Sequence, residues 1–295
     1  MAGRPGRPGA VVTFDPGRLG VWSGAEHFDV RPTQVAAYAA ATNEPAGPYR
    51  EGKLTPPVFA LLPAIDVYPH EIERLFGRTL SSLGSVHGEH DLLIDEPIGP
   101  LTTVTTRAAV TGVHAKASGT AVVVQTESRT NGGGLVNTQY AVQFLRGFDA
   151  GTSAGTVPPS WLARDAIRNE PPAANVTLRV HPDQSRRYAE ASGDFGDYTL
   201  DDAAAHRAGF PRPILHGACT MALVGRAVTV ACGGGDPARL RRLAVRFSAP
   251  CFPGDELTAT VWELRDAVPR ANVAFEVTDQ EGRKVITKGL AEVSA

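Results

Sequence analysis

Apolar and polar positions along this chain follow the same succession twice. Each succession opens with an Ala-rich stretch, TQVAAYAAAT at 33–42 and DQSRRYAEAS at 183–192, in which Ala and Tyr recur at helical spacing and predict a helix. An irregular Gly- and Pro-rich stretch and a second apolar segment come next: 43–57 and 58–68 in the first succession, 193–213 and 214–231 in the second. The last of these segments is long enough for a buried helix.

Each succession ends in runs of β-forming residues. The runs are 101–113, 120–130 and 135–146 in the first succession, and 239–248, 256–264, 271–279 and 284–293 in the second. TNGGG at 130–134 and DQEGR at 279–283 lie between runs as hairpin turns. Strands joined by hairpins beside a buried helix indicate an α+β protein, in which an antiparallel sheet wraps around the helix.

Two pairs of short motifs relate the successions to each other. YAAATNE at 38–44 matches YAEASGD at 188–194 at an offset of 150 residues, and EPIGPLTT at 96–103 matches APCFPGDE at 249–256 at an offset of 153. Nearly constant offsets over such distances indicate a duplicated domain. The predicted division is a flexible tail at 1–24, a first half at 25–150, a linker at 151–172 with a short helix at 160–168, and a second half at 173–295.

Composition and charge narrow the class of protein. The chain is 42 % hydrophobic and 20 % charged with a net charge of −2, which fits a soluble protein and gives no bulk attraction to nucleic acid or to an anionic membrane. It has no run of about 18 apolar residues that could span a membrane. The cysteines, Cys219, Cys232 and Cys251, have no zinc-site spacing. We therefore expect a reduced, cytoplasmic protein with no metal and no cofactor.

Three motifs carry a resemblance to a known family. SGDFGDYTLDDAAAHRAGFPRPILHGACTMAL at 192–223 resembles the signature of the R-specific enoyl-CoA hydratases, or MaoC-like dehydratases, which reads Ser-Gly-Asp-x-Asn-Pro-Leu/Ile-His and then Gly-Phe-x-x-Pro-Ile-Leu-His-Gly. FSAPCFPGDELT at 247–258 is similar to the family's strand with a Pro-Gly-Asp turn, and VHGEHDL at 86–92 to the corresponding strand of the degenerate amino-terminal half. The resemblance implies a double hotdog fold, with two antiparallel sheets each wrapped around a central helix. It also implies addition or removal of water across the double bond of an acyl thioester, carried on CoA or on an acyl carrier protein.

The catalytic pair that the resemblance implies is incomplete in this chain. Asp194 is the aspartate of the pair, but Thr199 occupies the histidine position, and Gly196 and Asp197 occupy the Asn and Pro positions. A His/Asp pair holds a water, removes its proton and returns a proton to the α-carbon, whereas a threonine hydroxyl has no useful pKa. The loop of the first half, 42–52, has no histidine to offer and carries Glu44 in the place of the aspartate.

The remaining candidates surround this loop. We expect Asp194 to be the sole acid–base group, Thr199 to position the nucleophile and Tyr198 to donate a hydrogen bond to a substrate oxygen. Backbone N–H groups at Gly217 would hold the thioester carbonyl, because charge that develops there is stabilised at a helix start. Gly196, Asp197 and His216 are expected to line the substrate, and Arg212, Arg242 and Arg246 to contact CoA phosphates.

Plainer interpretations stand beside these. Asp194 could cap a turn, Tyr198 could serve packing, His216 could be a satisfied structural histidine, and the arginines could be solvated surface groups. His87 and Glu89 share one face of a strand by the period of two, which is too few ligands for a metal site.

Three functions follow from these observations. The first is hydratase or dehydratase chemistry on an enoyl or 3-hydroxyacyl thioester. The second is a cyclase or isomerase on the same scaffold, because a substrate that carries its own nucleophile needs no activated water. The third is a non-catalytic subunit that binds acyl thioesters. We expect a possible homodimer and no nucleic-acid or membrane partner.

Overall fold

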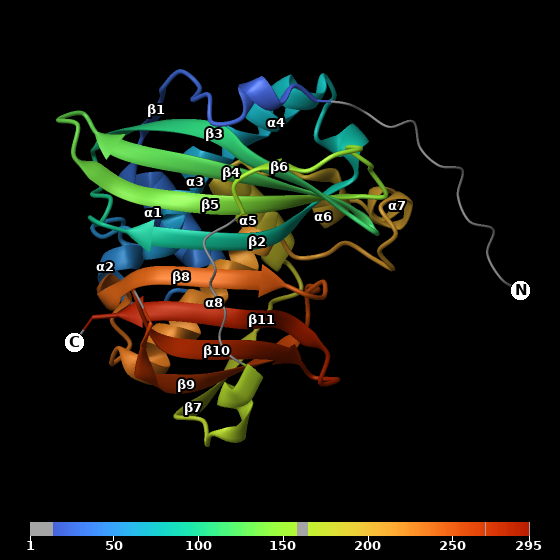
Figure 1. The fold of residues 1–295 in the computed structure, drawn as a ribbon. Coiled ribbons are helices and arrows are strands. Elements are labelled where there is room, and N and C mark those ends of the chain that lie inside the picture. Colours follow the sequence, from blue (N-terminus) through green and yellow to red (C-terminus); the bar gives the residue numbers. More distant parts are fainter. Residues whose placement is uncertain (1–13, 158–164, 269, 295) are drawn as a thin grey trace, which may run out of the picture.

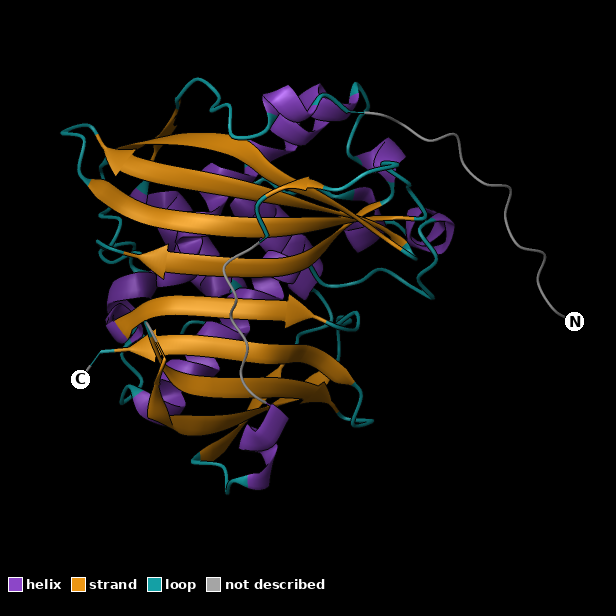
Figure 2. Ribbon diagram, viewed as in Figure 1, coloured by secondary structure: helices purple, strands orange, loops and turns teal. Residues whose placement is uncertain are grey.

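The protein has one antiparallel sheet, and the helices pack on one of its two faces (Figures 1 and 2). The computed structural model describes residues 14–157, 165–268 and 270–294. Within these residues the sheet has 11 strands in the order β1-β3-β4-β5-β2-β8-β11-β10-β9-β7, with β6 paired to β3. The strands are β1 (Glu26–Asp29), β2 (Ser85–Ile94), β3 (Thr103–Lys116), β4 (Gly119–Thr130), β5 (Leu135–Arg146), β6 (Ala154–Gly155), β7 (Ala174–Arg179), β8 (Leu240–Phe247), β9 (Glu256–Val268), β10 (Ala271–Asp279) and β11 (Lys284–Val293).

The strand pairings confirm the α+β hotdog prediction and add one feature to it. β2 of the first half pairs with β8 of the second, so the two predicted sheets are joined edge to edge. The long strands lie where the sequence places them. Three short strands were not predicted: β1 and β7, which lie at the ends of the sheet, and β6, which lies in the predicted linker.

The helices of the two halves correspond in place but differ in regularity. They are α1 (Pro32–Ala41), α2 (Gly47–Arg50), α3 (Leu61–Ile65), α4 (Tyr68–Phe76), α5 (Gln184–Ser192), α6 (Asp197–Leu200), α7 (Asp202–Arg207) and α8 (Gly217–Cys232), with 3₁₀ turns η1 (Pro16–Arg18), η2 (Pro57–Ala60), η3 (Ser81–Leu83), η4 (Asp165–Asn169) and η5 (Pro237–Arg239).

The central helix is continuous only in the second half. α8 runs for 16 residues, with most of its side chains buried against the sheet. The corresponding segment of the first half breaks into η2, α3 and α4. Pro69 stands in the first turn of α4, where a residue without an N–H begins a helix rather than continuing one.

An approximate twofold axis relates the halves. In the β2–β8 ladder, Asp91 lies opposite Ala244, which is the residue 153 positions later. In the helical layer, the rings of Tyr38 and Tyr188, 150 positions apart, lie 5.9 Å from each other. A residue that faces its own equivalent lies on a twofold axis, so the two offsets found in the sequence are the signature of this symmetry.

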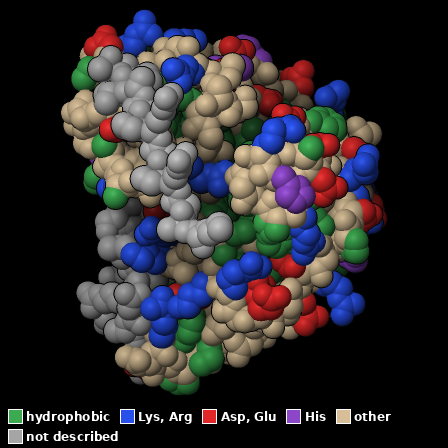
Figure 3. Space-filling model, turned by 90° about the vertical axis from the view of Figure 1, so that its right-hand side faces the viewer, with side chains coloured by type: hydrophobic (Ala, Val, Ile, Leu, Met, Phe, Trp, Pro, Cys, Tyr) green, Lys and Arg blue, Asp and Glu red, His purple; other side chains and the backbone are tan. Residues whose placement is uncertain are grey.

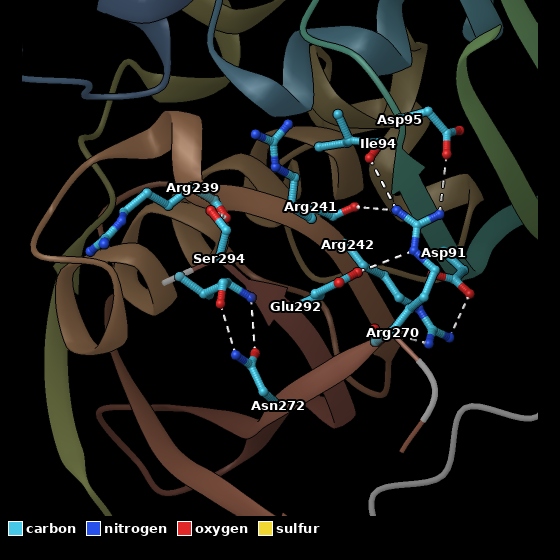
Figure 4. A network of polar contacts seen from close by, with 11 residues as sticks. Asp91, Ile94, Asp95, Arg239, Arg241, Arg242, Arg270, Asn272, Glu292 and Ser294 are labelled. Atoms are coloured by element: carbon cyan, nitrogen blue, oxygen red, sulfur yellow. Dashed lines mark hydrogen bonds and ion pairs between the residues drawn. The ribbon is translucent and has the colours of Figure 1, made fainter. Parts of the chain in front are cut away.

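Charged side chains fasten the seam between the halves (Figure 4). Arg242 of β8 donates two hydrogen bonds to Asp91 of β2, at 2.9 and 2.8 Å, and both side chains are buried. Arg270 reaches across the same seam to the backbone of Ile94 at 3.1 Å and forms ion pairs with Asp95 and Glu292. The halves therefore form one body.

The segments predicted to be a tail and a linker both contact β3 where the structure describes them. Gly20 and Ser23 donate backbone hydrogen bonds to Val110 and Ala108, each at 2.8 Å, and β6 pairs with the same strand. Residues 1–13 and 158–164, which include most of the predicted short helix at 160–168, lie outside the described residues. The described part has no helix that is both long and apolar enough to cross a membrane.

Candidate active site

The loop that carries Asp194 is a tight turn closed by its own polar groups. α5 ends at Gly193, whose φ of +83° lies in the left-handed region that favours glycine. The Asp194 N–H donates to Ser192 Oγ at 3.1 Å, and Asp194 Oδ1 accepts from the Gly196 N–H at 3.2 Å. Ser192, Gly193, Asp194 and Gly196 are therefore needed to form the turn, and one oxygen of the Asp194 carboxylate is already hydrogen-bonded.

Thr199 and His216 fix this loop to the start of α8. The Thr199 hydroxyl donates to the Gly196 carbonyl at 2.5 Å. His216 Nε2 lies 2.9 Å from Thr199 Oγ1 and 2.9 Å from the Asp194 carbonyl, and since that carbonyl can only accept, Nε2 carries the proton. Thr199 is buried and its hydroxyl proton is committed to the backbone, so the threonine at the histidine position holds the loop.

His216 is a neutral anchor in this arrangement. Burial lowers the pKa of its imidazole, although the carboxylate and carbonyl of Asp194 act in the opposite direction. Nδ1 is buried without a hydrogen-bond partner among the described residues. The interactions of Nε2 agree with the structural interpretation of this histidine.

Side chains from both halves lie close to the Asp194 carboxylate. Burial, and then the Asp194 charge, raise the pKa of Tyr198 and that of Tyr68. Tyr198 packs its ring on Phe210 at 5.7 Å. Tyr68 belongs to α4 of the first half, where its hydroxyl accepts a hydrogen bond from Gln143 at 3.0 Å. Sequence reasoning missed Tyr68, because it lies in an apolar segment with no motif around it.

Gly217 is the first residue of α8 and lies in close contact with His87 and Phe247. The first N–H groups of an α-helix have no partner within the helix. A Cβ atom at Gly217 would lie 3.3 Å from His87 Nδ1 and 3.4 Å from the Phe247 ring, closer than side chains usually pack. Gly217 thus combines an amide at a helix start with the absence of a side chain, and both favour a position that binds a carbonyl oxygen.

The histidines of β2 form a chain that the sequence pattern did not predict. We expected His87 and Glu89 to share a face, and this is wrong, because the β2–β5 register shifts between them and the bulge breaks the alternation. His87 Nε2 instead lies 3.0 Å from His90 Nδ1, and His90 Nε2 lies 2.9 Å from Gln139 Oε1. Burial lowers the pKa of both imidazoles, that of His90 to about 4.

The predicted phosphate-binding arginines divide into three cases. Arg242 was assigned wrongly, because its guanidinium is buried on Asp91 at the seam. Arg212 donates to the Pro253 carbonyl at 2.8 Å and lies over the Phe252 ring, so it holds the turn before β9. Arg246 is half-exposed and lies 3.7 Å from Glu89.

Further basic groups lie near Arg246. Burial raises the pKa of Glu89, while Arg246, Lys288 and Lys116 lower it, which places three cations around one carboxylate. Figure 3 shows the end of the molecule that carries α6 and α7, with Lys and Arg side chains spread over its surface. Asp197 and His206 are exposed on this part of the chain.

A cavity occurs at the related loop of the first half. Its walls include Thr42 and Glu44 of that loop, Val58 of η2, Arg226 of α8 and Leu240 of β8. Glu44 is buried and accepts a hydrogen bond from the Ala46 N–H at 3.0 Å, much as Asp194 does from Gly196. The duplicated sequence thus gives two related loops, and the loop of the first half lines a cavity together with β8 of the second half.

Comparison with known proteins places the chain among thioester hydratases and dehydratases. The MaoC like domain family matches residues 165–285. The 3-hydroxyacyl-thioester dehydratase Y of Mycobacterium tuberculosis is 31 % identical over 228 residues, which cover 74 % of this chain and 75 % of that protein. The peroxisomal multifunctional enzyme type 2 of Drosophila melanogaster is 29 % identical over 81 % of this chain, which spans only 40 % of that enzyme.

Solved structures show the same architecture. A MaoC-like dehydratase from Phytophthora capsici superposes with a TM-score of 0.78 at 23 % identity, covering 94 % of this chain and 97 % of that one. A Mycobacterium tuberculosis protein described as having a double hotdog fold superposes with a TM-score of 0.59 at 13 % identity, covering 93 % and 96 %. The fold, the Asp194 loop and the dehydratase relative lead to one assignment: this chain belongs to the MaoC-like dehydratase family.

Proposed function

We propose that this chain adds water to an enoyl thioester, or removes it from a 3-hydroxyacyl thioester, at the Asp194 loop. The observation that carries the proposal is the attachment of this loop to the start of α8 by His216. This attachment bonds the backbone carbonyl of Asp194 to the side chain of the residue that precedes Gly217, and the proposal takes the Asp194 carboxylate and the Gly217 amide as the two groups that act on one substrate. The relative named as a 3-hydroxyacyl-thioester dehydratase supports the reaction type.

Hydration would use the carboxylate and the amide together. A water oxygen bonds to the β-carbon while the Asp194 carboxylate takes one of its protons, and the electron pair of the double bond moves onto the thioester oxygen. The Gly217 N–H donates to that oxygen as its charge grows, which lowers the barrier most in a site with little water. Asp194 then gives the proton to the α-carbon and regenerates the carbonyl. Dehydration is the reverse sequence.

The other loop residues have supporting tasks in this proposal. The Thr199 hydroxyl positions the loop rather than the nucleophile, because its proton is bonded to the Gly196 carbonyl. Gly196 shapes the turn, Tyr198 lines the site beside the carboxylate, and Asp197 lies at its exposed rim.

We assign the carrier to CoA, whose phosphates would meet Arg246, Lys288 and Lys116. Phosphate oxygens are bound by such cationic groups, and Arg246 is the least engaged of the three arginines considered. Arg212, which is tied to a turn, is a weaker candidate for the same contact. A cytoplasmic location and a homodimer are further parts of the proposal, to be tested by fractionation and light scattering.

The test is a spectrophotometric assay with crotonyl-CoA and longer enoyl-CoAs, following the loss of the conjugated thioester absorbance. Turnover that Asp194→Asn abolishes supports the proposal. Thr199→His restores the family's pair, and we expect it to raise the hydration rate. Tight binding of acyl-CoA without turnover, in wild type and in Thr199→His alike, would replace this proposal with a binding subunit. Turnover confined to substrates with an internal nucleophile would replace it with a cyclase.

A further inference from the structure

We propose that His87 of β2 supplies the imidazole that the Asp194 loop lacks, by holding the attacking water through Nδ1. This inference rests on the proposed hydration and names the second group of that same site. It takes the missing histidine from the other half of the molecule, across the seam.

The hydrogen-bond chain on β2 fixes which nitrogen of His87 carries the proton. Gln139 Nε2 lies 2.8 Å from the Ala60 carbonyl, which can only accept, so Gln139 Oε1 is the atom that faces His90. His90 Nε2 must therefore donate to Oε1, which leaves His90 Nδ1 as an acceptor. His87 Nε2 donates to that acceptor at 3.0 Å, and Nδ1 of the neutral His87 ring carries a lone pair.

His87 Nδ1 lies against Gly217, at the start of α8. His87 Nδ1 is 3.3 Å from the position that a Cβ on Gly217 would take, and the ring packs on Phe247 with centroids 4.9 Å apart. The Glu89 backbone also forms a hydrogen bond with the ring, which raises the pKa of His87 against the larger, lowering effect of burial. A carbonyl oxygen held by the Gly217 amide would bring an acyl chain beside His87.

The related cavity of the first half supports this placement. Leu240 is the residue 153 positions after His87, and it lines that cavity together with Glu44 and Val58. By the twofold relation of the halves, we infer that β2 faces the Asp194 loop as β8 faces the Glu44 loop. The same strand position is a leucine on one side and a histidine on the other.

The proposed step keeps Asp194 in its role. The water donates one O–H to His87 Nδ1 and the other to the Asp194 carboxylate. Asp194 takes its proton as the water oxygen bonds to the β-carbon, and later gives it to the α-carbon. The proton that faces His87 stays on oxygen and becomes the hydroxyl proton of the product, so the imidazole ends the cycle unchanged.

Two substitutions separate this role from a structural one. Asn places an amide oxygen near the position of Nδ1, whereas Gln keeps a polar group near Nε2, where it can still bond to His90. If His87 orients the water, His87→Gln should lower kcat by about 10²-fold with KM little changed, and His87→Asn should retain most of the activity. Loss in His87→Asn with full activity in His87→Gln would overturn the inference and leave the hydratase proposal in place. His206→Gln, at an exposed histidine, is the matched control.

A second measurement decides the case in which the wild type shows no hydration. In ¹⁵N NMR of the histidine rings, the inference expects an unprotonated Nδ1 on His87 whose signal moves when an unreactive acyl-thioether of CoA binds. A protonated Nδ1, or a signal that binding leaves unmoved, would overturn it even if the analogue binds elsewhere. A moved signal without turnover would retain His87 at the acyl site and reject the hydratase proposal.

Discussion

The two acidic loops of this protein descend from one sequence and have diverged in what surrounds them. Asp194 is bonded through its carbonyl to His216, and the opposite half provides Tyr68 near its charge and His87 against Gly217. Glu44 lies beside Val58, and the opposite half provides Arg226 and Leu240. The comparison indicates that each loop depends on the other half for most of its chemistry.

The halves differ in the regularity of the central helix as well as in their side chains. The amide at Gly217 begins an unbroken helix of 16 residues, whereas Val58 lies within a 3₁₀ turn that two short helices follow. A long helix sums its peptide dipoles at its first turn, which favours developing negative charge. The second half therefore has the better place to bind a thioester oxygen.

The largest expected effect comes from exchanging each acid for its amide. We expect Asp194→Asn to lower kcat by about 10²–10⁴-fold, the usual consequence of removing a general acid–base group. Glu44→Gln should leave turnover unchanged, since an amide oxygen can still accept from the Ala46 N–H. Both are measured with the enoyl-CoA assay, and equal losses in the two variants would show that the loops are not functionally distinct.

The second largest effect should come from the ion pairs at the seam between the halves, and it should be an effect on the free energy of unfolding. Asp91→Ala leaves the buried guanidinium of Arg242 without its carboxylate, and we expect a loss of about 3–5 kcal/mol in the free energy of unfolding. Asp95→Ala removes a partly exposed ion pair of Arg270 at the same seam and should cost less than about 1 kcal/mol. Urea unfolding followed by circular dichroism gives both values, and similar costs would contradict the assignment of Asp91 as the buried anchor.

The pair His87 and His90 should make stability depend on pH, whereas Leu240 and Leu243, their counterparts on β8, have no titratable group. Burial lowers the pKa of His90 to about 4, below the value of about 6.5 in an unfolded chain. Between these values the unfolded chain binds more protons, so stability is fully present above pH ~6.5 and is lost as the pH falls toward ~4, by roughly 3 kcal/mol.

The control for this prediction is a variant that carries the equivalent residue of the other half. His90→Leu introduces the residue type that β8 has 153 positions later, at Leu243. Denaturant unfolding at several pH values should show a shallower loss in this variant. An unchanged slope would mean that other groups cause the acid sensitivity.

Adding a methyl group at Gly217 tests its close contact with His87, and this change has the smallest expected effect. Gly217→Ala places a Cβ 3.3 Å from His87 Nδ1, so the ring must shift by a few tenths of an ångström, and we expect kcat to fall about tenfold. Val58→Ala, a change in the η2 turn of the first half, should cost about 2 kcal/mol of stability through lost packing and leave kcat unchanged. Full activity in Gly217→Ala would show that this face of the helix does not meet substrate.

The amino-acid sequence by itself determined the duplication, the long strands and α1, α5 and α8. These follow from periodicity and from offsets of 150 and 153 residues, which are local or repeated patterns. It also determined the family, through the motif around Asp194 and the Pro-Ile-Leu-His-Gly block. Motifs of this kind are readable because the loop and the helix start that they build are contiguous in the chain.

Tertiary structure alone decided what meets that motif. Asp91 and Arg242 are 151 positions apart, and only strand pairing at the seam shows that Arg242 serves a buried carboxylate and not a phosphate. A one-residue bulge in β2 turns His87 from the side of Glu89 to that of His90, and periodicity cannot foresee where a strand breaks its alternation. Tyr68 and His87 belong to the first half and meet groups of the second half, because the two halves pair along the seam. No local sequence pattern records such a long-range contact.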